Sequence, residues 1–148
     1  MAAALGYTAG MFAALSDINW LSVLAARVVH FLLAGAWFAG LFARQYAAAL
    51  GISDRPQAKP APRFLIGPFL CSAVTIAATA LLLRALAITT LGPGLMLGAV
   101  VGVGYLVPMT VNIAINPLFP RPFHYALINA PLFLLGSLVA TGVLVALS

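Results

Sequence analysis

Two ionisable side chains, Arg27 and His30, lie three residues apart within an apolar stretch and are the best candidates for chemistry in this sequence. At this spacing two side chains share one face of a helix. An imidazole there could ligate a haem or chlorin metal, relay protons, or hydrogen-bond to a polar side chain of a neighbouring helix. A second histidine, His124, begins another apolar stretch roughly half a bilayer away, so a bis-histidine haem within one chain is not expected. A five-coordinate tetrapyrrole, a relay and a structural hydrogen bond stay open for His30.

Arg27 and Arg84 carry positive charge into apolar surroundings. Arg27 lies about 14 Å into its stretch, counted from Ile18 at ~1.5 Å per residue. Its side chain could snorkel to the outer membrane surface, and Arg84, near the outer end of its own stretch, could do the same. Asp17 is an available ion-pair partner for either arginine. The alternative is a site for an anion or a lipid headgroup, formed by Arg27, Arg84 and His30.

Three asparagines form a further group of polar candidates. Asn112 and Asn116 are four residues apart at the end of one apolar stretch, and Asn129 lies one to two turns into the next. A short loop joins the two stretches, so the three amides could meet. They would then tie two helices together or line a small polar cavity.

No catalytic set is visible in the sequence. It contains Asp17 and Asp54 but no glutamate, and the two aspartates are expected at opposite membrane faces, which excludes a carboxylate pair within one chain. HExxH, P-loop and serine–histidine–acid patterns are absent. The single cysteine, Cys71, allows neither an internal disulfide nor a CxxC metal site. We therefore predict a protein that is not an enzyme and holds no metal site, with the tetrapyrrole at His30 as the only cofactor considered.

The composition requires that most of the chain lies in lipid. Hydrophobic residues make up 64% and charged residues 6% of the 148 positions, with a mean hydropathy of +1.15. A soluble domain carries about 25% charged residues. The net charge of +5 comes from basic residues beside apolar stretches, so it indicates orientation in a bilayer and no nucleic-acid partner.

Four stretches have the roughly 20 apolar residues that a membrane helix needs. The fold class predicted is all-α, an integral membrane four-helix bundle. Residues 1–17 are predicted to form a short N-terminal extension or interfacial helix ahead of the four-helix domain at 18–148. The predicted spans are 18–42, 64–88, 91–115 and 122–147.

Basic residues predict the orientation of the bundle. The loop at 43–63 has four basic residues against Asp54, a net charge of +3, and the loop at 116–121 carries Arg121. In a chain with four spans these two loops share a side. By the positive-inside rule both loops are cytoplasmic and both termini lie outside, in the inner membrane of a bacterium.

Small residues predict how the helices pack. Gly94, Gly98 and Gly102 repeat every four residues and form a groove along one face, where another backbone can approach closely. Gly136 and Ala140 offer a similar face on the fourth span. Packing within the chain and an oligomer interface both fit this pattern. Pro108 and Pro131 should bend the third and fourth helices, either as fixed kinks or as a hinge.

Two groups of residues carry a resemblance to a known family. An Asn-Trp start, a Gly-x-Trp-aromatic step, a phenylalanine and a closing Leu-Gly occur in order at Asn19, Trp20, Gly35, Trp37, Phe38, Phe42, Leu50 and Gly51. The second group is Asn116–Phe119, Arg121–Pro122, Leu127–Ala130 and Gly136. Together they resemble the opening and the final hairpin of a bacterial membrane family catalogued as domain of unknown function 1761. The resemblance implies four membrane helices and no particular activity. Arg27 and His30 depart from it, because the family usually looks apolar at these positions.

Three functional hypotheses follow from the sequence. The leading one is a membrane subunit or scaffold that packs with copies of itself or with other subunits in the lipid bilayer. The second is a small oligomeric transporter or channel, suggested by Arg27, His30 and the glycine face. The third is a tetrapyrrole-binding protein that uses His30, with Trp37 further along the same face.

Overall fold

The computed structural model describes residues 14–54 and 61–148, and within these residues every regular element is helical. The predicted N-terminal extension falls mainly on residues 1–13, outside the described part, and so do Arg55 and Lys59 of the first loop.

Four continuous helical segments are each long and apolar enough to cross a membrane. The first is α2 (Trp20–Gly35) with a π-helical continuation η1 (Ala36–Leu41), followed by the short α3 (Ala43–Ala49). The other three are α4 (Arg63–Ala85), α5 (Leu91–Val101) with η2 (Gly102–Leu106) and α6 (Val107–Ala114), and α7 (Pro122–Ala146). The prediction of an all-α membrane bundle with four spans is confirmed, and the protein is a multi-pass membrane protein.

Asn19 fixes the beginning of α2. Its side-chain oxygen accepts hydrogen bonds from the backbone N–H groups of Leu21 and Ser22, which otherwise have no partner at a helix start. Its amide nitrogen donates to the backbone oxygen of Leu147 at 2.8 Å. One side chain therefore caps α2 and ties it to the end of α7.

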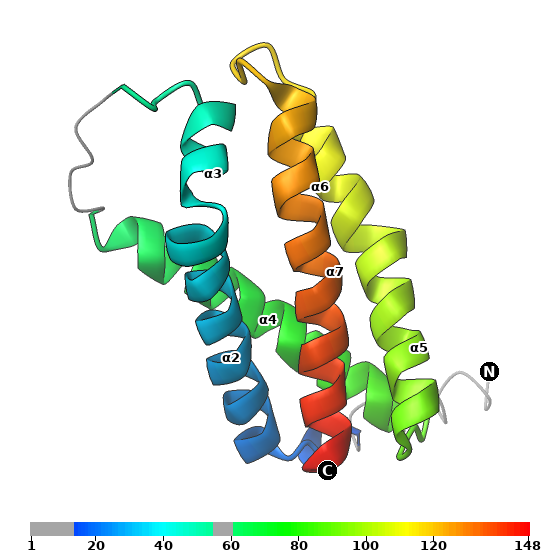
Figure 1. Cartoon of the computed structure of the whole chain (residues 1–148). Helices are drawn as coiled ribbons and strands as arrows, with labels where there is room; N and C mark the ends of the chain where they lie inside the picture. The colour runs from blue at the N-terminus through cyan, green and yellow to red at the C-terminus, as the bar shows by residue number, and fades with distance from the viewer. Residues whose placement is uncertain (1–13, 55–60) are drawn as a thin grey trace.

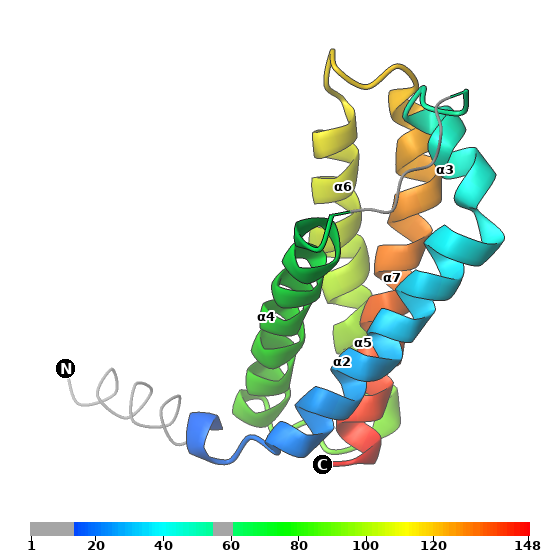
Figure 2. The ribbon, with the colours of Figure 1, turned by 90° about the vertical axis from the view of Figure 1, so that its left-hand side faces the viewer.

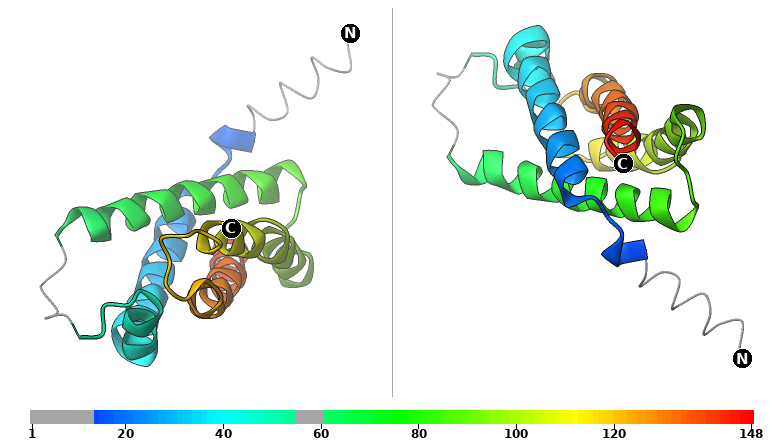
Figure 3. Two further views of the ribbon diagram at one scale, coloured as in Figure 1. Left: turned by 90° about the horizontal axis from the view of Figure 1, so that it is seen from above. Right: turned by 90° about the horizontal axis from the view of Figure 1, so that it is seen from below.

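The fourth span lies at the centre of the arrangement. α7 contacts α2 and α4 on one side and α5 and α6 on the other (Figure 1). The chain ends at the same end of the bundle as the start of α2 and the connection from α4 to α5. The end of α3 and the connection from α6 to α7 lie at the opposite end, which we call the α3 end. α4 crosses the bundle at a steep tilt, as the views from above and below the bundle show (Figure 3). Its first turn begins well below the α3 end (Figure 2).

The glycine face of α5 and η2 packs against α7. An added Cβ at Gly94 would lie 2.7 Å from Val145 Cγ2, and one at Gly102 would lie 2.7 Å from Leu134 Cδ1. At Gly98 the nearest atoms are Thr141 Oγ1 at 2.9 Å and the Ser137 backbone oxygen at 3.2 Å. These residues pack the third span onto the fourth, so the glycine face is covered within the chain.

Pro108 coincides with a change of helix type, whereas Pro131 lies within a continuous α-helix. Pro108 lies in the first turn of α6, directly after the π-helical turn of η2, and its missing N–H falls where the hydrogen-bond pattern of the helix changes. Pro131 lies inside α7, one residue before the buried Leu132. The backbone thus accommodates Pro108 by a local change of helix type.

Candidate functional site

A cleft of about 680 Å³ opens on the side of the bundle where α4 falls short of the α3 end. Its walls come from α2 with η1, from α4 and from α7. At its closed side lie Arg27, His30 and the small residues of α7; its open rim includes the exposed Phe64, Leu65 and Cys71. Because α4 is tilted, it leaves α2 and α7 uncovered toward the α3 end. The tilt therefore produces the cleft.

Arg27 is held inside the bundle by α4. Its side chain is only 3% exposed, and Nε donates to the backbone oxygen of Phe69 at 2.9 Å. The guanidinium carbon lies 3.8 Å from the centroid of the Phe69 ring and 5.5 Å from that of Phe31. Aromatic faces stabilise a cation without accepting a strong hydrogen bond from it. The Nη1 nitrogen is buried and has no hydrogen-bond partner among the described residues.

The predicted snorkelling of Arg27 is therefore wrong. The long side chain is buried in the interior against α4. Asp17 is exposed, and within residues 14–54 and 61–148 it forms no ion pair with Arg27 or Arg84. The physical reason is the tilt of α4, which brings the Phe69 carbonyl and ring to the depth of Arg27.

His30 lies beside Arg27 on α2 and packs against α7. A Cβ added to Gly136 would be 2.7 Å from His30 Nε2 and 2.8 Å from Cδ2, so the glycine makes room for the imidazole. The other ring nitrogen, Nδ1, is buried without a hydrogen-bond partner in the described part of the chain. The structural hydrogen bond considered for His30 is thus not formed. Gly136, which the sequence suggests for helix packing, serves here to seat a side chain.

Three hydroxyl groups of α4 line the cleft, and each bonds back to its own helix. Ser72 donates to the Pro68 oxygen at 2.6 Å, Thr75 to the Cys71 oxygen at 3.2 Å, and Thr79 to the Thr75 oxygen at 2.9 Å. The hydroxyl hydrogens of these three residues are therefore already donated to backbone oxygens of α4. Arg27 and His30 retain free hydrogen-bonding capacity, which makes them the polar groups of the cleft that lack partners.

Aromatic residues line the cleft toward the α3 end. Phe38 and Tyr46 both line it, with ring centroids 4.8 Å apart. Burial, followed by the charge and hydrogen bond of Tyr125, raises the pKa of Tyr46 to about 12, so its phenol stays neutral in this position. Trp37 does not face the cleft: its Nε1 donates to the Ile128 backbone oxygen at 3.0 Å and joins η1 to α7. That contact gives Trp37 a structural role.

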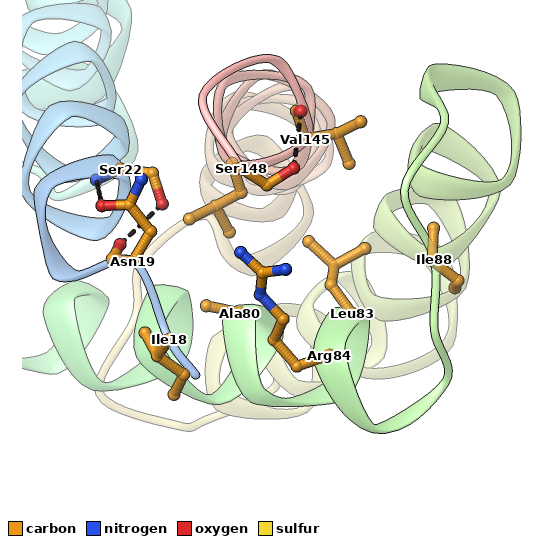
Figure 4. Close-up of a pocket in the computed structure, with 10 residues that line it drawn as sticks. Ile18, Asn19, Ser22, Ala80, Leu83, Arg84, Ile88, Val145 and Ser148 are labelled. Atoms are coloured by element: carbon orange, nitrogen blue, oxygen red, sulfur yellow. Dashed lines mark hydrogen bonds between the residues drawn. The ribbon is translucent and has the colours of Figure 1, made fainter. Parts of the chain in front are cut away.

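Arg84 lies apart from the cleft. It lines a small pocket of about 20 Å³ at the end of the bundle where α2 begins, and its side chain extends from α4 toward Ser148 (Figure 4). Asn19 and Ser22 of α2 border the same pocket. A volume of this size holds about one water molecule. The hypothesis of one anion site built from Arg27, Arg84 and His30 is therefore wrong, because Arg84 lines the small pocket whereas Arg27 and His30 line the cleft.

The three asparagines are not joined to one another. Asn129 is buried and donates to the Tyr125 backbone oxygen at 2.8 Å, within its own helix. Asn116 accepts from the Leu118 backbone N–H at 2.9 Å in the loop. Asn112 is exposed on α6. The hypothesis of an amide tie between the third and fourth spans is wrong, since each of the two bonded amides is satisfied locally.

Sequence reasoning missed the aromatic pair around Arg27 and the role of Gly35. Phe31 lies four residues after Arg27 on the same helix, a spacing that could have indicated the contact. Phe69 is 42 residues from Arg27 in the sequence, and no sequence pattern indicates that the two are in contact. Gly35 lines the cleft, and a Cβ there would meet nothing within 4 Å, so the space beside it belongs to the cleft.

A comparison with family models matches residues 21–145 to a family described as "Protein of unknown function (DUF1761)". The matched region runs from the first turn of α2 to the last turn of α7. No curated protein and no solved structure matches the chain.

Proposed function

The chain belongs to the DUF1761 family, whose description assigns no activity, and we propose that it is a non-enzymatic membrane protein that binds an amphipathic molecule in the cleft between α2 and α4. One observation carries the proposal. The cleft of about 680 Å³ is walled by apolar and aromatic side chains, and two polar groups without partners lie at its closed side.

The cleft has the general properties of a ligand site. Pockets for small molecules typically measure about 300–1,000 Å³, are mostly apolar, and contain a few polar groups that fix orientation. Here the apolar body of the ligand would contact Phe31, Phe38 and Phe69, and its polar part would meet Arg27 and His30. A side opening at the depth of a bilayer admits molecules that are already dissolved in lipid. Access from the water phase is therefore unnecessary.

This proposal replaces the subunit or scaffold as the leading hypothesis. The scaffold and oligomeric channel hypotheses both drew support from the glycine face, and α7 occupies that face within the chain. A channel would also need a polar path from one end to the other. The polar groups without partners gather instead at one depth, beside Arg27. Any protein partner would have to bind the lipid-facing surfaces of the helices.

We propose the orientation that the basic residues favour. Arg44 lies in α3 and Arg121 lies in the loop between α6 and α7, both toward the α3 end, and Arg63 begins α4. Positive charge is retained on the cytoplasmic side. The α3 end would then face the cytoplasm and both termini would lie outside, in the inner membrane of a bacterium. The cleft would open within the cytoplasmic half of the bilayer.

Native mass spectrometry on protein released gently from its own membrane tests the proposal, with identification of any added mass. We expect one bound amphiphile per chain, lost in Gly35→Phe, which fills the cleft. Gly92→Phe is the matched control, because its Cβ also meets nothing within 4 Å and it lies outside the cleft. A wild-type chain without any added mass, across several gentle detergents, would refute the proposal. A coloured adduct with a metal would favour the tetrapyrrole hypothesis at His30.

A further inference from the structure

We propose that the ligand is a long-chain carboxylic acid whose carboxyl group is bound by Arg27 and His30, an inference that rests on the function proposed above. It assigns a head-group chemistry to the closed side of the cleft and a role to the two side chains that lack partners.

Arg27 requires an anion that the chain does not supply. The sequence has two acidic residues, and Asp17 and Asp54 are both exposed and form no ion pair with Arg27 in the described part of the chain. Arg27 is 3% exposed, and among residues 14–54 and 61–148 its only hydrogen bond goes to the Phe69 backbone oxygen. A buried charge without a counter-ion is costly, more so at membrane depth. A ligand with one acidic group would relieve that cost, and the cleft contains one arginine or lysine, which matches a single negative charge.

Arg27 Nη1 and His30 Nδ1 are both buried and lack hydrogen-bond partners in the described part of the chain, and a carboxyl group is complementary to both. Arg27 Nη1 is a donor, and neutral His30 presents one donor and one acceptor nitrogen. A carboxylic acid that arrives neutral can pass its proton to His30 Nδ1, and the carboxylate formed accepts from Arg27 Nη1 and from the imidazolium N–H. The acid O–H bond breaks and a His30 N–H bond forms, so the site keeps its net charge while Arg27 gains a counter-ion. A phosphodiester is already ionised and brings no proton, although it could accept from the same two nitrogens.

Depth also favours a carboxylic acid. Arg27 is seven residues into α2, about 10 Å from the outer helix end at ~1.5 Å per residue. A head group must pass hydrocarbon to reach it, which a protonated carboxylic acid can do without charge and a phosphodiester cannot. From Arg27 to Ala39 the cleft follows α2 and η1 for about 18 Å, close to half of a hydrocarbon core of ~30 Å. That length suits one acyl chain, with its tail directed to the α3 end.

The exposed Cys71 on the cleft wall, the single cysteine of the chain, allows a direct test. The rate of its alkylation by a small apolar maleimide would be measured on the full chain in detergent, with increasing oleate, oleyl alcohol or methyl oleate. We expect oleate to protect Cys71 at the lowest concentration. In Arg27→Met the protection by oleate should need about tenfold more ligand or more, as the loss of a hydrogen bond to a charged group implies. Arg27→Lys should recover part of it.

Arg84→Met is the matched control and should leave protection unchanged, because Arg84 lies outside the cleft. If Arg27→Met fails to fold, His30→Leu and the ranking of the three ligands on the wild-type chain decide the question. Equal protection by oleate and methyl oleate, unaffected by Arg27 and His30 variants, would overturn the carboxyl inference while leaving an amphiphile in the cleft. If none of the three ligands protects Cys71, and if Gly35→Phe leaves the added mass in native mass spectrometry unchanged, the proposed function is overturned as well.

Discussion

Arg27 and Phe69 meet twice: the arginine Nε donates to the Phe69 backbone oxygen at 2.9 Å, and the guanidinium carbon lies 3.8 Å from the centroid of the Phe69 ring. The two residues come from antiparallel spans. Their contact locks α4 against α2 at the closed side of the cleft, and it holds a charge inside the bundle. The geometry of the cleft therefore depends on this pair.

Replacing Phe69 by leucine should weaken the bundle. The variant removes the aromatic face under the guanidinium but keeps the backbone acceptor, and a desolvated cation–π contact contributes about 0.5–2 kcal/mol. The free energy of unfolding, measured by titration with a denaturing detergent, should fall by about this amount. Phe64→Leu is the control: Phe64 is 62% exposed on the same helix, and Arg63 lies 5.0 Å from its ring centroid. An equal loss in both variants would contradict the special role of the Arg27–Phe69 contact.

Replacing Gly98 by alanine should separate the third span from the fourth. The new Cβ would lie 2.9 Å from Thr141 Oγ1 and 3.2 Å from the Ser137 backbone oxygen, and the backbone of α7 cannot give way as a side-chain tip can. We expect a loss of about 1–3 kcal/mol in the free energy of unfolding, typical of overpacking. Gly92→Ala, whose Cβ meets nothing within 4 Å, should be neutral or slightly stabilising. Unchanged stability in Gly98→Ala would show that α5 and α7 are not closely packed.

The raised pKa of Tyr46 predicts that the free energy of unfolding falls at high pH. Its pKa is raised to about 12 in the folded protein, chiefly by burial, against about 10 in an unfolded chain. The folded state therefore holds the phenolic proton more tightly. The resulting stability is fully present below about pH 10 and is lost as the pH rises from about 10 to 12. Tyr46→Phe should flatten this decline in unfolding measurements. A tyrosinate titration in which Tyr46 ionises near pH 10 would contradict the buried position.

The four spans could be predicted from the sequence because hydropathy and length act locally. Each span needs only its own residues to be apolar, and these requirements are visible along the chain. The close approach at Gly98 was also foreseeable in kind, since glycines four residues apart allow a second backbone to come near. Which helix comes near, α7 of the same chain or a helix of another copy, depends on the whole arrangement. The sequence left both open.

The tilt of α4 could not be predicted, and the errors about Arg27 and Arg84 follow from it. In an upright bundle Arg27 would have nothing polar at its depth, so snorkelling was reasonable. The tilt places the Phe69 carbonyl beside Arg27 and carries Arg84 to the small pocket near Ser148. Tilt is set by packing between helices, and no short motif specifies it. Asn129 illustrates a related limit, because it satisfies its amide on its own helix, at the Tyr125 oxygen.

The orientation can be measured with single cysteines in a Cys71→Ser background. Arg121→Cys lies in the loop at the α3 end, and Ser148→Cys lies at the opposite end. In intact cells a membrane-impermeant thiol reagent should label the cysteine at position 148 and leave that at position 121 unlabelled. Both should react after the membrane is opened. The reverse pattern would place the α3 end outside and would move the opening of the cleft to the other leaflet.

The most direct test of the central claim is photo-crosslinking with a long-chain fatty acid that carries a diazirine on its tail, followed by mapping of the adducts. If the cleft binds the acid, adducts will gather on cleft residues such as Phe38, Phe64 and Cys71, and will disappear in Gly35→Phe but persist in Gly92→Phe. Excess oleate should compete for these positions. Adducts spread evenly over lipid-facing residues outside the cleft, such as Met96 and Leu127, and insensitive to Gly35→Phe would mean that the cleft holds no specific ligand.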